Sequence, residues 1–220
     1  MKESIISVEG LRHNYGKVTA VDDISFSVEK GQIFSFLGPN GAGKTTTINV
    51  LTTLLPMQKG KVTISGFDLE TQQDSVRQSI GIVFQDFRLL ENRTAFENIA
   101  LALRIRGIGE KETKIRAYDA LKTVNLRHKS DSYPKTLSGG EQQRVVIARA
   151  IVSEPAILLA DEPTGNLDPD TAEGVARIFK DIHAKGTTIL IATHNRELYK
   201  NTGKRVLRLD SGNLTGEGLG

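Results

Sequence analysis

The stretch that decides the fold is Ile33–Leu51, "IFSFLGPNGAGKTTTINVL". Its first five residues, Ile33–Leu37, form a short apolar run that indicates a buried strand. The glycine-rich stretch Gly38–Thr45 follows, and a helix is expected over about Lys44–Leu54. Further along the chain, strand patterns keep alternating with helix patterns. This alternation predicts an α/β fold with a mostly parallel sheet.

The glycine-rich loop "GPNGAGKT" matches G-x-x-x-x-G-K-[ST] and lies between a strand and a helix, which predicts a P-loop NTPase core. Its glycines let backbone N–H groups point at phosphate oxygens, and the helix N-terminus adds partial positive charge. Lys44 is expected to reach the β and γ phosphates of a bound nucleotide, and the Thr45 hydroxyl suits Mg²⁺. A glycine-rich turn without a ligand is the alternative. The expected nucleotide-binding residues of this loop are Gly38, Pro39, Asn40, Gly41, Ala42, Gly43, Lys44, Thr45 and Thr46.

A second buried strand, in "AILLADE" (Ala156–Glu162), ends in two carboxylates. The strand should deliver Asp161 to the edge of the sheet that holds the phosphate loop, where it can hold Mg²⁺ through water. Because Pro163 ends the ladder, Glu162 can turn toward the γ-phosphate and act on the attacking water as a catalytic base. An ordinary acidic strand end is the alternative for both residues.

The rest of the chain fits one domain over residues 1–220, with an antiparallel β subdomain first and a helical subdomain inserted at about 87–150. Thr94 and Glu97 predict a capping box at a helix start, and Leu101 and Ile105 keep helical spacing up to about Asn125. A short helix is expected after His194. The other predicted elements are strands Ile5–Glu9, Ile24–Val28, Lys61–Ser65, Ile80–Phe84, 187–192 and 205–209, and helices ending near Ile151 and over Ala172–Ala184.

Composition excludes several classes of protein. Net charge is only +3, whereas nucleic-acid binders usually show a denser basic face. The charge alone decides nothing, but no nucleic-acid partner is expected. Cysteine is absent, which excludes disulfides and thiolate metal sites. The longest apolar runs are far shorter than the roughly 20 residues that a membrane helix needs, so no membrane span is expected. With no signal-peptide pattern at the start, a cytoplasmic location is expected.

"LSGGEQQR", which begins at Leu137, is a second glycine-led helix start. Ser138 is a plausible N-cap, and that is locally sufficient. Gly139 and Gly140 are more than a cap needs, however, and would expose N–H groups at a positive helix end, which is an anion site. We call this helix start the second cradle, and the phosphate loop the first. One nucleotide needs one such anion site, so two cradles suggest two nucleotides.

In order, "GPNGAGKT", Gln85, "LSGGEQQR", "ILLADE", "GNLD" and His194 resemble the ATP-binding cassette (ABC) family over nearly the whole chain. The resemblance implies a homodimer that encloses two ATP molecules. Each ATP would lie between one chain's phosphate loop and the other chain's Ser138, Gly139 and Gly140. A two-fold interface has this reciprocity.

The resemblance also implies roles for four single residues. Tyr15 would stack on adenine, or is simply an exposed tyrosine in a turn. Gln85 would touch Mg²⁺ and sense the partner subunit, or is an exposed strand end. Asp168 would link the two sites across the dimer, or only starts a helix. His194, which follows a core strand, would contact the γ-phosphate as a catalytic residue.

The two halves resemble different branches of the family. The first resembles drug-exporter ATPases, whereas "FRLLENRTAFENIALAL" and "LLADEPTGNLD" resemble the FtsE-type cell-division group with its lipoprotein-release and macrolide-export relatives. Natural mosaic variation and a hybrid joined near Gln85–Asp86 are both open. The stretch Asp86–Leu103 is expected to contact an integral membrane subunit, a permease or FtsX-like protein, with Phe87, Leu89 and Leu90 either binding it or plugging the subdomain's core.

Three functions are open. The first is an ATPase subunit, peripheral on the inner face of the membrane, that drives a separate transport or cell-division protein. The second is a soluble ABC ATPase of DNA repair or translation, but only about 90 residues separate the phosphate loop from "LSGGEQQR", too few for the long coiled coils of repair ATPases. The third is an ATP-gated scaffold without hydrolysis, which the presence of Glu162 and His194 disfavours.

Overall fold

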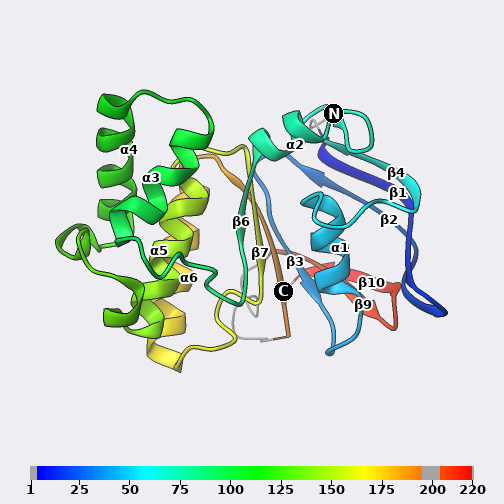
Figure 1. Ribbon diagram of the computed structural model, residues 1–220. Helices are drawn as coiled ribbons and strands as arrows, with labels where there is room; N and C mark the ends of the chain where they lie inside the picture. The colour runs from blue at the N-terminus through cyan, green and yellow to red at the C-terminus, as the bar shows by residue number, and fades with distance from the viewer. Residues whose placement is uncertain (1–3, 195–203, 220) are drawn as a thin grey trace.

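The computed structural model describes residues 4–194 and 204–219 (Figure 1). Its strands and helices alternate along most of the chain. In order they are β1 (Ser4–Tyr15), β2 (Val18–Glu29), β3 (Ile33–Leu37), α1 (Lys44–Leu51), β4 (Lys59–Ile64), β5 (Phe67–Asp68), α2 (Gln73–Ser79), β6 (Ile80–Val83), α3 (Ala95–Ile105), α4 (Glu110–Thr123), α5 (Gly139–Ile151), β7 (Ile157–Asp161), α6 (Pro169–Ala184), β8 (Thr188–Thr193), β9 (Arg205–Asp210) and β10 (Asn213–Leu219). Short 3₁₀ turns, Arg127–Lys129 and Pro134–Thr136, precede α5.

Two sheets form the β structure. The first is antiparallel, with the order β2-β1-β4-β5. The second has the order β10-β9-β3-β8-β7-β6, and all its pairs are parallel except the edge pair β9–β10. The predicted α/β class, with an antiparallel first part and a mostly parallel main sheet, is therefore confirmed.

The parallel sheet is buried on both faces, and β7 shows how its residues divide. Leu158 and Ala160 pack with the helices α3 to α6, whereas Ile157 and Leu159 pack with α1 and the antiparallel sheet. Such two-sided burial explains why this strand is apolar throughout rather than alternating. Helix α1 thus lies between the two sheets, and the longer helices lie on the other side of the main sheet (Figure 1).

The helical region differs from its predicted pattern in two places. The pattern expected up to about Asn125 is split, because α3 ends at Ile105 and α4 starts at Glu110 after the glycines at 107 and 109. Helix α3 buries Ile99 and Leu103, whereas Ile105 is 77% exposed. The Leu101 and Ile105 spacing therefore belongs to a helix, but not to its buried face.

Other boundaries also shift, most at β1 and β2, which run well beyond Ile5–Glu9 and Ile24–Val28, and the strands β5 and β10 and the helix α2 were not anticipated. Helix α5 already includes Gly139 and Gly140, which were expected to precede it. Strand β10 follows the turn at 210–213, and its glycines at alternate positions hide the usual strand pattern. The short helix expected after His194 lies outside the described residues.

Candidate functional site

The phosphate loop joins β3 to α1, and its glycines are required by the backbone and by packing. Gly41 and Gly43 have φ of 80° and 98°, a left-handed conformation that glycine adopts without steric cost. A Cβ on Gly43 would lie 2.5 Å from the carbonyl oxygen of Ala20, and one on Gly38 would lie 2.2 Å from that of Leu209. Strands on both sides therefore fix the loop's path.

The N-terminus of α1 has no side-chain cap, because the N-cap residue is Gly43. Helix starts leave backbone N–H groups without intrahelical partners, and these attract anions. Pro39, Asn40, Gly41 and Thr45 are exposed there, so a ligand can reach the loop. This is the arrangement that a phosphate group requires.

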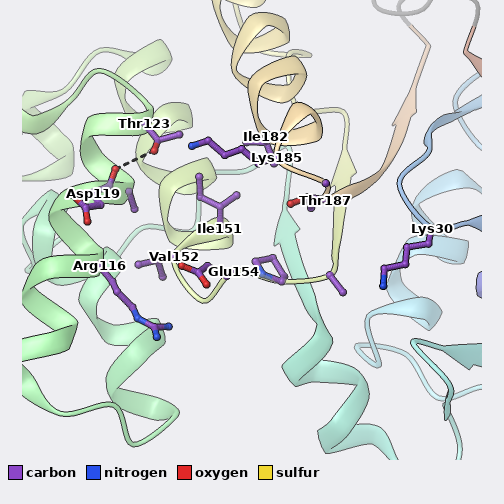
Figure 2. A pocket seen from close by; sticks show the side chains of 14 residues that line it. Lys30, Arg116, Asp119, Thr123, Ile151, Val152, Glu154, Ile182, Lys185 and Thr187 are labelled. Carbon is purple, nitrogen blue, oxygen red and sulfur yellow. Dashed lines mark hydrogen bonds between the residues drawn. The ribbon is translucent and has the colours of Figure 1, made fainter.

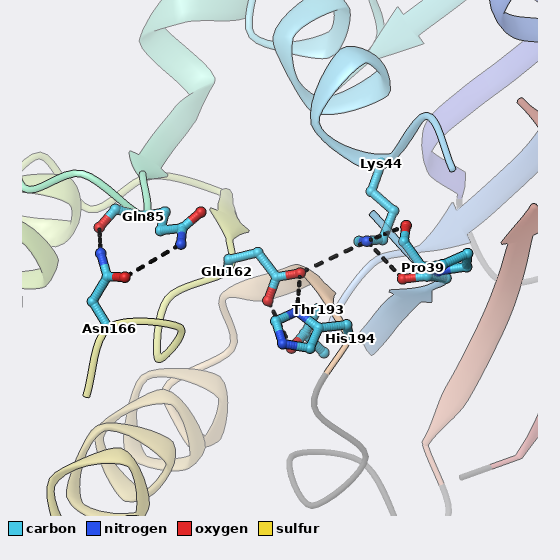
Figure 3. A network of polar contacts seen from close by, with 8 residues as sticks. Pro39, Lys44, Gln85, Glu162, Asn166, Thr193 and His194 are labelled. Atoms are coloured by element: carbon cyan, nitrogen blue, oxygen red, sulfur yellow. Dashed lines mark hydrogen bonds and ion pairs between the residues drawn. The ribbon is translucent and has the colours of Figure 1, made fainter. Parts of the chain in front are cut away.

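Lys44 lies buried beside this loop, at 5% exposure. Its Nζ donates hydrogen bonds to the carbonyl oxygens of Gly38 and Pro39, at 2.7 and 3.1 Å. The same Nζ lies 3.7 Å from Oε1 of Glu162. The structure therefore brings together the cation and the carboxylate that the sequence predicted at this edge (Figure 3).

Glu162 follows β7 with a left-handed backbone, φ 46°, and its N–H donates to the carbonyl oxygen of Ala192. This turn directs its buried side chain to the end of β8. There Thr193 Oγ1 donates to Oε2 at 3.1 Å, and His194 Nδ1 lies 2.9 Å from Oε1 (Figure 3). A non-glycine residue held at positive φ is uncommon and frequent at functional sites. Sequence reasoning missed Thr193, although it directly precedes His194.

Asp161 ends β7 and is 6% exposed. Among the described residues its Oδ1 has no hydrogen-bond partner. Burial raises the pKa of this carboxyl group, while the Thr45 side chain opposes the shift. A buried carboxylate oxygen without a partner, with a hydroxyl nearby, fits a site for a hard divalent cation. In the described parts of the chain, no group of three or more histidine, cysteine or carboxylate side chains is arranged to hold a metal ion.

Gln85 follows β6 and lies apart from the Lys44–Glu162 pair. Its Nε2 donates to Oδ1 of Asn166 at 3.4 Å, and Asn166 Nδ2 donates to the Gln85 carbonyl oxygen at 3.5 Å (Figure 3). Asn166 belongs to the "GNLD" stretch, but sequence reasoning assigned it no role. The two predicted loops therefore touch each other through this pair.

The second cradle is a capped helix start. Ser138 Oγ accepts from the Glu141 N–H at 3.2 Å, and Glu141 Oε2 accepts from the Ser138 N–H at 2.8 Å. The two residues thus form a capping box, of which sequence reasoning predicted only the N-cap Ser138. A Cβ on Gly140 would lie 2.3 Å from Thr171 Cγ2, so packing against α6 also demands glycine there.

Ser138 can still donate a hydrogen bond to a ligand through its hydroxyl. Its hydroxyl only accepts in the capping box, so its O–H remains able to donate, and the side chain is exposed. Asp168 caps the neighbouring helix α6 by accepting from the Thr171 N–H at 3.0 Å. Hydrogen bonds from Thr171 hold the pKa of Asp168 below its usual value. Two adjacent helix starts thus face solvent with a hydroxyl and an ionised carboxylate.

Tyr15 lies at the tip of the β1–β2 hairpin and is 51% exposed. Its ring meets the buried His13 ring edge to face, with centroids 5.0 Å apart. The ring face available to solvent is compatible with either predicted role.

The stretch after Gln85 corrects one expectation. Leu89 is only 8% exposed and belongs to the core of the helical region, so it is not available to a partner. Phe87 is partly buried against the same core, whereas Leu90 is 40% exposed. Consecutive apolar residues in a loop do not reveal which of them the helices cover.

A cavity of about 480 Å³ lies elsewhere (Figure 2). Its lining includes Ala156 and Thr187, which precede β7 and β8, so it lies at the opposite sheet edge from Asp161 and Thr193. Charged residues such as Lys30, Asp119 and Lys185 line it, and all three are exposed. It is therefore separate from the phosphate-loop site.

Over most of its length, the chain is similar to ATP-binding proteins of one family. The ABC transporter family model matches residues 21–165. The cell division ATP-binding protein FtsE of Streptococcus pneumoniae (serotype 2, strain D39 / NCTC 7466) is 41% identical over 216 residues, covering 96% of this chain and 94% of that protein. FtsE of Bacillus subtilis (strain 168) is 44% identical, covering 89% and 87%.

Two further likenesses extend the comparison. The methionine import ATP-binding protein MetN of Rhizobium johnstonii is 39% identical and matches 98% of this chain, but only 61% of its own length is covered. A dimeric structure of MJ0796, a bacterial ABC transporter cassette, has a TM-score of 0.88 at 32% identity, covering 97% of this chain and 98% of that one. In the described parts of the chain, no helix combines the length and apolarity that crossing a membrane requires.

Proposed function

The chain belongs to the ABC transporter family of ATP-binding proteins, and we propose that Lys44, Glu162 and His194 carry out its hydrolysis of ATP. The predicted family and ATPase class are confirmed. The observation that carries the proposed site is the convergence of an ammonium, a carboxylate and an imidazole, supplied by the start of α1 and by the residues that follow β7 and β8.

Each residue has a distinct task in this proposal. Lys44 neutralises charge on the β and γ phosphates, next to the open start of α1. Glu162 orients the attacking water and takes its proton, while Thr193 and His194 hold the carboxylate in place. His194 is 56% exposed at its side chain, so it can also reach the γ-phosphate.

Mg²⁺ is the proposed cofactor, and when bound it neutralises phosphate charge. The residues to hold it are Thr45 and Asp161, with Gln85 as a further ligand. The unpartnered Oδ1 of Asp161 supports this assignment. Gln85 lies beside Asn166 in this structure, so its contribution requires movement of the loop that follows β6.

Asp161→Asn tests the metal assignment. Because burial penalises the Asp161 carboxylate, the neutral amide should leave the melting temperature in EDTA unchanged or raise it. Hydrolysis in Mg²⁺ should fall by about 100-fold or more, since one ligand is lost. The same change at exposed Asp181 of α6 is the control. Full Mg²⁺-dependent hydrolysis by Asp161→Asn would contradict the assignment.

The second cradle is proposed to serve a second copy of the chain. Ser138, Gly139 and Gly140 would meet the ATP held by the partner's phosphate loop, and Asp168 would lie at the same interface. The exposed Ser138 hydroxyl and the description of MJ0796 as dimeric support this arrangement. Tyr15 is proposed to stack on the adenine ring, since its ring is exposed and strand β2 of the same hairpin approaches the phosphate loop, with the Ala20 carbonyl next to Gly43.

A membrane subunit is the proposed partner, with this chain peripheral on the cytoplasmic face of the membrane. Relatives named for cell division and for methionine import support coupling to such a partner. The contact is proposed on residues 86–103, with Leu90 and the exposed part of Phe87 as its apolar elements. Apolar side chains in an exposed loop are typical of binding surfaces.

Leu90→Asp tests this contact. The charge should release the protein from the membrane fraction of its cells, while the melting temperature of the purified protein stays within about 2 °C, because exposed positions contribute little to stability. Ile115→Asp on α4, where the side chain is 56% exposed outside this stretch, is the matched control and should stay membrane-bound. Retention of Leu90→Asp in the membrane fraction would place the contact elsewhere.

A further inference from the structure

Arg149, in the last turn of α5, contacts the loop that follows β6. Its Nη1 donates to the carbonyl oxygen of Arg88 at 2.8 Å, and its Nη2 donates to that of Phe87 at 3.1 Å. The planar guanidinium therefore grips two successive peptide groups. Five donors in a rigid fork make arginine suited to this, whereas lysine offers a single point of contact.

Among the residues that the structure describes, no carboxylate forms an ion pair with Arg149, and the charged side chain that affects its pKa is Arg88, which is also a cation. Burial lowers the pKa of the Arg149 guanidinium, and Arg88 adds to that shift. A half-buried cation held only by carbonyl groups is a costly way to stabilise a helix. Its geometry points instead to control of the loop.

The gripped loop is strained. Arg88 has φ 48°, which a non-glycine side chain rarely adopts, and its guanidinium lies over the Phe84 ring, 4.1 Å from the centroid. Such a conformation persists only where surrounding contacts enforce it. Hydrogen bonds from Arg149 to the carbonyls on both sides of the Arg88 Cα, those of Phe87 and Arg88, are contacts of that kind.

The loop also reaches the other end of α5 and the neighbouring "GNLD" stretch. A Cβ on Gly139 would lie 3.8 Å from the Phe87 ring, so Phe87 abuts the helix start next to Ser138. Gln85 pairs with Asn166. Phe87 thus approaches the first turn of α5 with its ring, while the Phe87 and Arg88 carbonyls accept hydrogen bonds from Arg149 in its last turn.

We propose that Arg149 is a positioning residue that ties residues 85–88 to α5, so that Gln85 and Ser138 move as one unit. The proposal rests on the proposed function, in which Gln85 responds to the nucleotide and Ser138 meets the partner's ATP. A helix is stiff along its axis, so a grip at its last turn is transmitted to its first. Without these two hydrogen bonds, residues 85–88 relax from their strained conformation, and movement of Gln85 is no longer transmitted to Ser138.

Arg106 provides a matched control. Its guanidinium also donates to two successive carbonyl oxygens, those of Gln78 at 2.9 Å and Arg77 at 3.4 Å, and burial lowers its pKa as well. The two carbonyls that it binds belong to α2, which precedes β6, whereas those that Arg149 binds follow β6. Arg149→Lys and Arg106→Lys therefore make the same chemical change at contacts on opposite sides of β6.

The test is hydrogen exchange of backbone amides in both variants and the unaltered protein, without nucleotide. Arg149→Lys should speed exchange over residues 86–90 by about tenfold, as loss of a charged hydrogen bond does. Arg106→Lys should leave those amides unchanged. In Mg²⁺ and ATP, Arg149→Lys should lower kcat by about tenfold with KM unchanged, since the phosphate loop is untouched.

Three results overturn the proposal: unchanged exchange over 86–90, equal acceleration over the whole of α5 and the core with a lower melting temperature, or failure of both Arg149→Lys and Arg149→Gln to fold. The last two make Arg149 a stabilising residue only. If the unaltered protein fails to hydrolyse ATP, the proposed function is wrong, while the exchange comparison still decides the role of Arg149.

Discussion

Glu162→Gln is expected to reduce ATP turnover by about 10²–10⁴-fold, the usual contribution of a general base, while ATP binding is preserved. Glutamine has nearly the same shape, so the contacts at Thr193 and His194 stay possible. It cannot accept a proton from water, however. Lys44 and the open start of α1 are unchanged, and these are the groups proposed to hold the phosphates.

The measurement is the steady-state rate of phosphate release, beside titration with a fluorescent ATP analogue. Glu154→Gln, at an exposed position after α5, is the matched control and should keep full turnover. Turnover near the unaltered rate in Glu162→Gln would transfer the role of base to another group, with His194 next to be tested by His194→Ala. Loss of ATP binding instead would mean that Glu162 shapes the cradle rather than the chemistry.

The sequence predicted the parts of this site that depend on local order. Ile33–Leu37 as a buried strand and the helix from Lys44 follow from composition and from glycine spacing, and the structure has both. Proximity of Asp161 to the phosphate loop followed from the rule that ligands bind at the carboxyl edge of parallel strands. These inferences need no knowledge of distant contacts.

Other features depend on contacts between distant segments, and the sequence could not supply them. Glu162 meets Thr193 only because β7 and β8 are neighbours in the sheet, which sequence order does not state. Leu89 is buried because the helical region packs over it, whereas Leu90 next to it is exposed. Gly140 was interpreted as part of an anion cradle, but its approach to Thr171 gives it a packing reason too.

Ser138→Arg is expected to abolish ATP-dependent dimerisation while leaving ATP binding to the monomer intact. In the proposed dimer the Ser138 hydroxyl donates to the partner's γ-phosphate at close range, and a long side chain cannot occupy that space. The Glu162→Gln background is needed, because slowed hydrolysis lets the ATP-bound dimer accumulate. Size-exclusion chromatography with light scattering, with Mg²⁺ and ATP, gives the fraction of dimer.

The capping box requires a control, since Ser138 also stabilises α5. Ser138→Ala removes the same cap, at a cost of about 1 kcal/mol, but adds no bulk. If the cap alone matters, both variants lose the dimer and melt at the same lower temperature. If the second cradle faces a partner's ATP, Ser138→Ala keeps a substantial fraction of dimer and Ser138→Arg keeps none. A dimer that persists in Ser138→Arg would place the two phosphate loops away from Ser138, and the two-chain site would then be wrong.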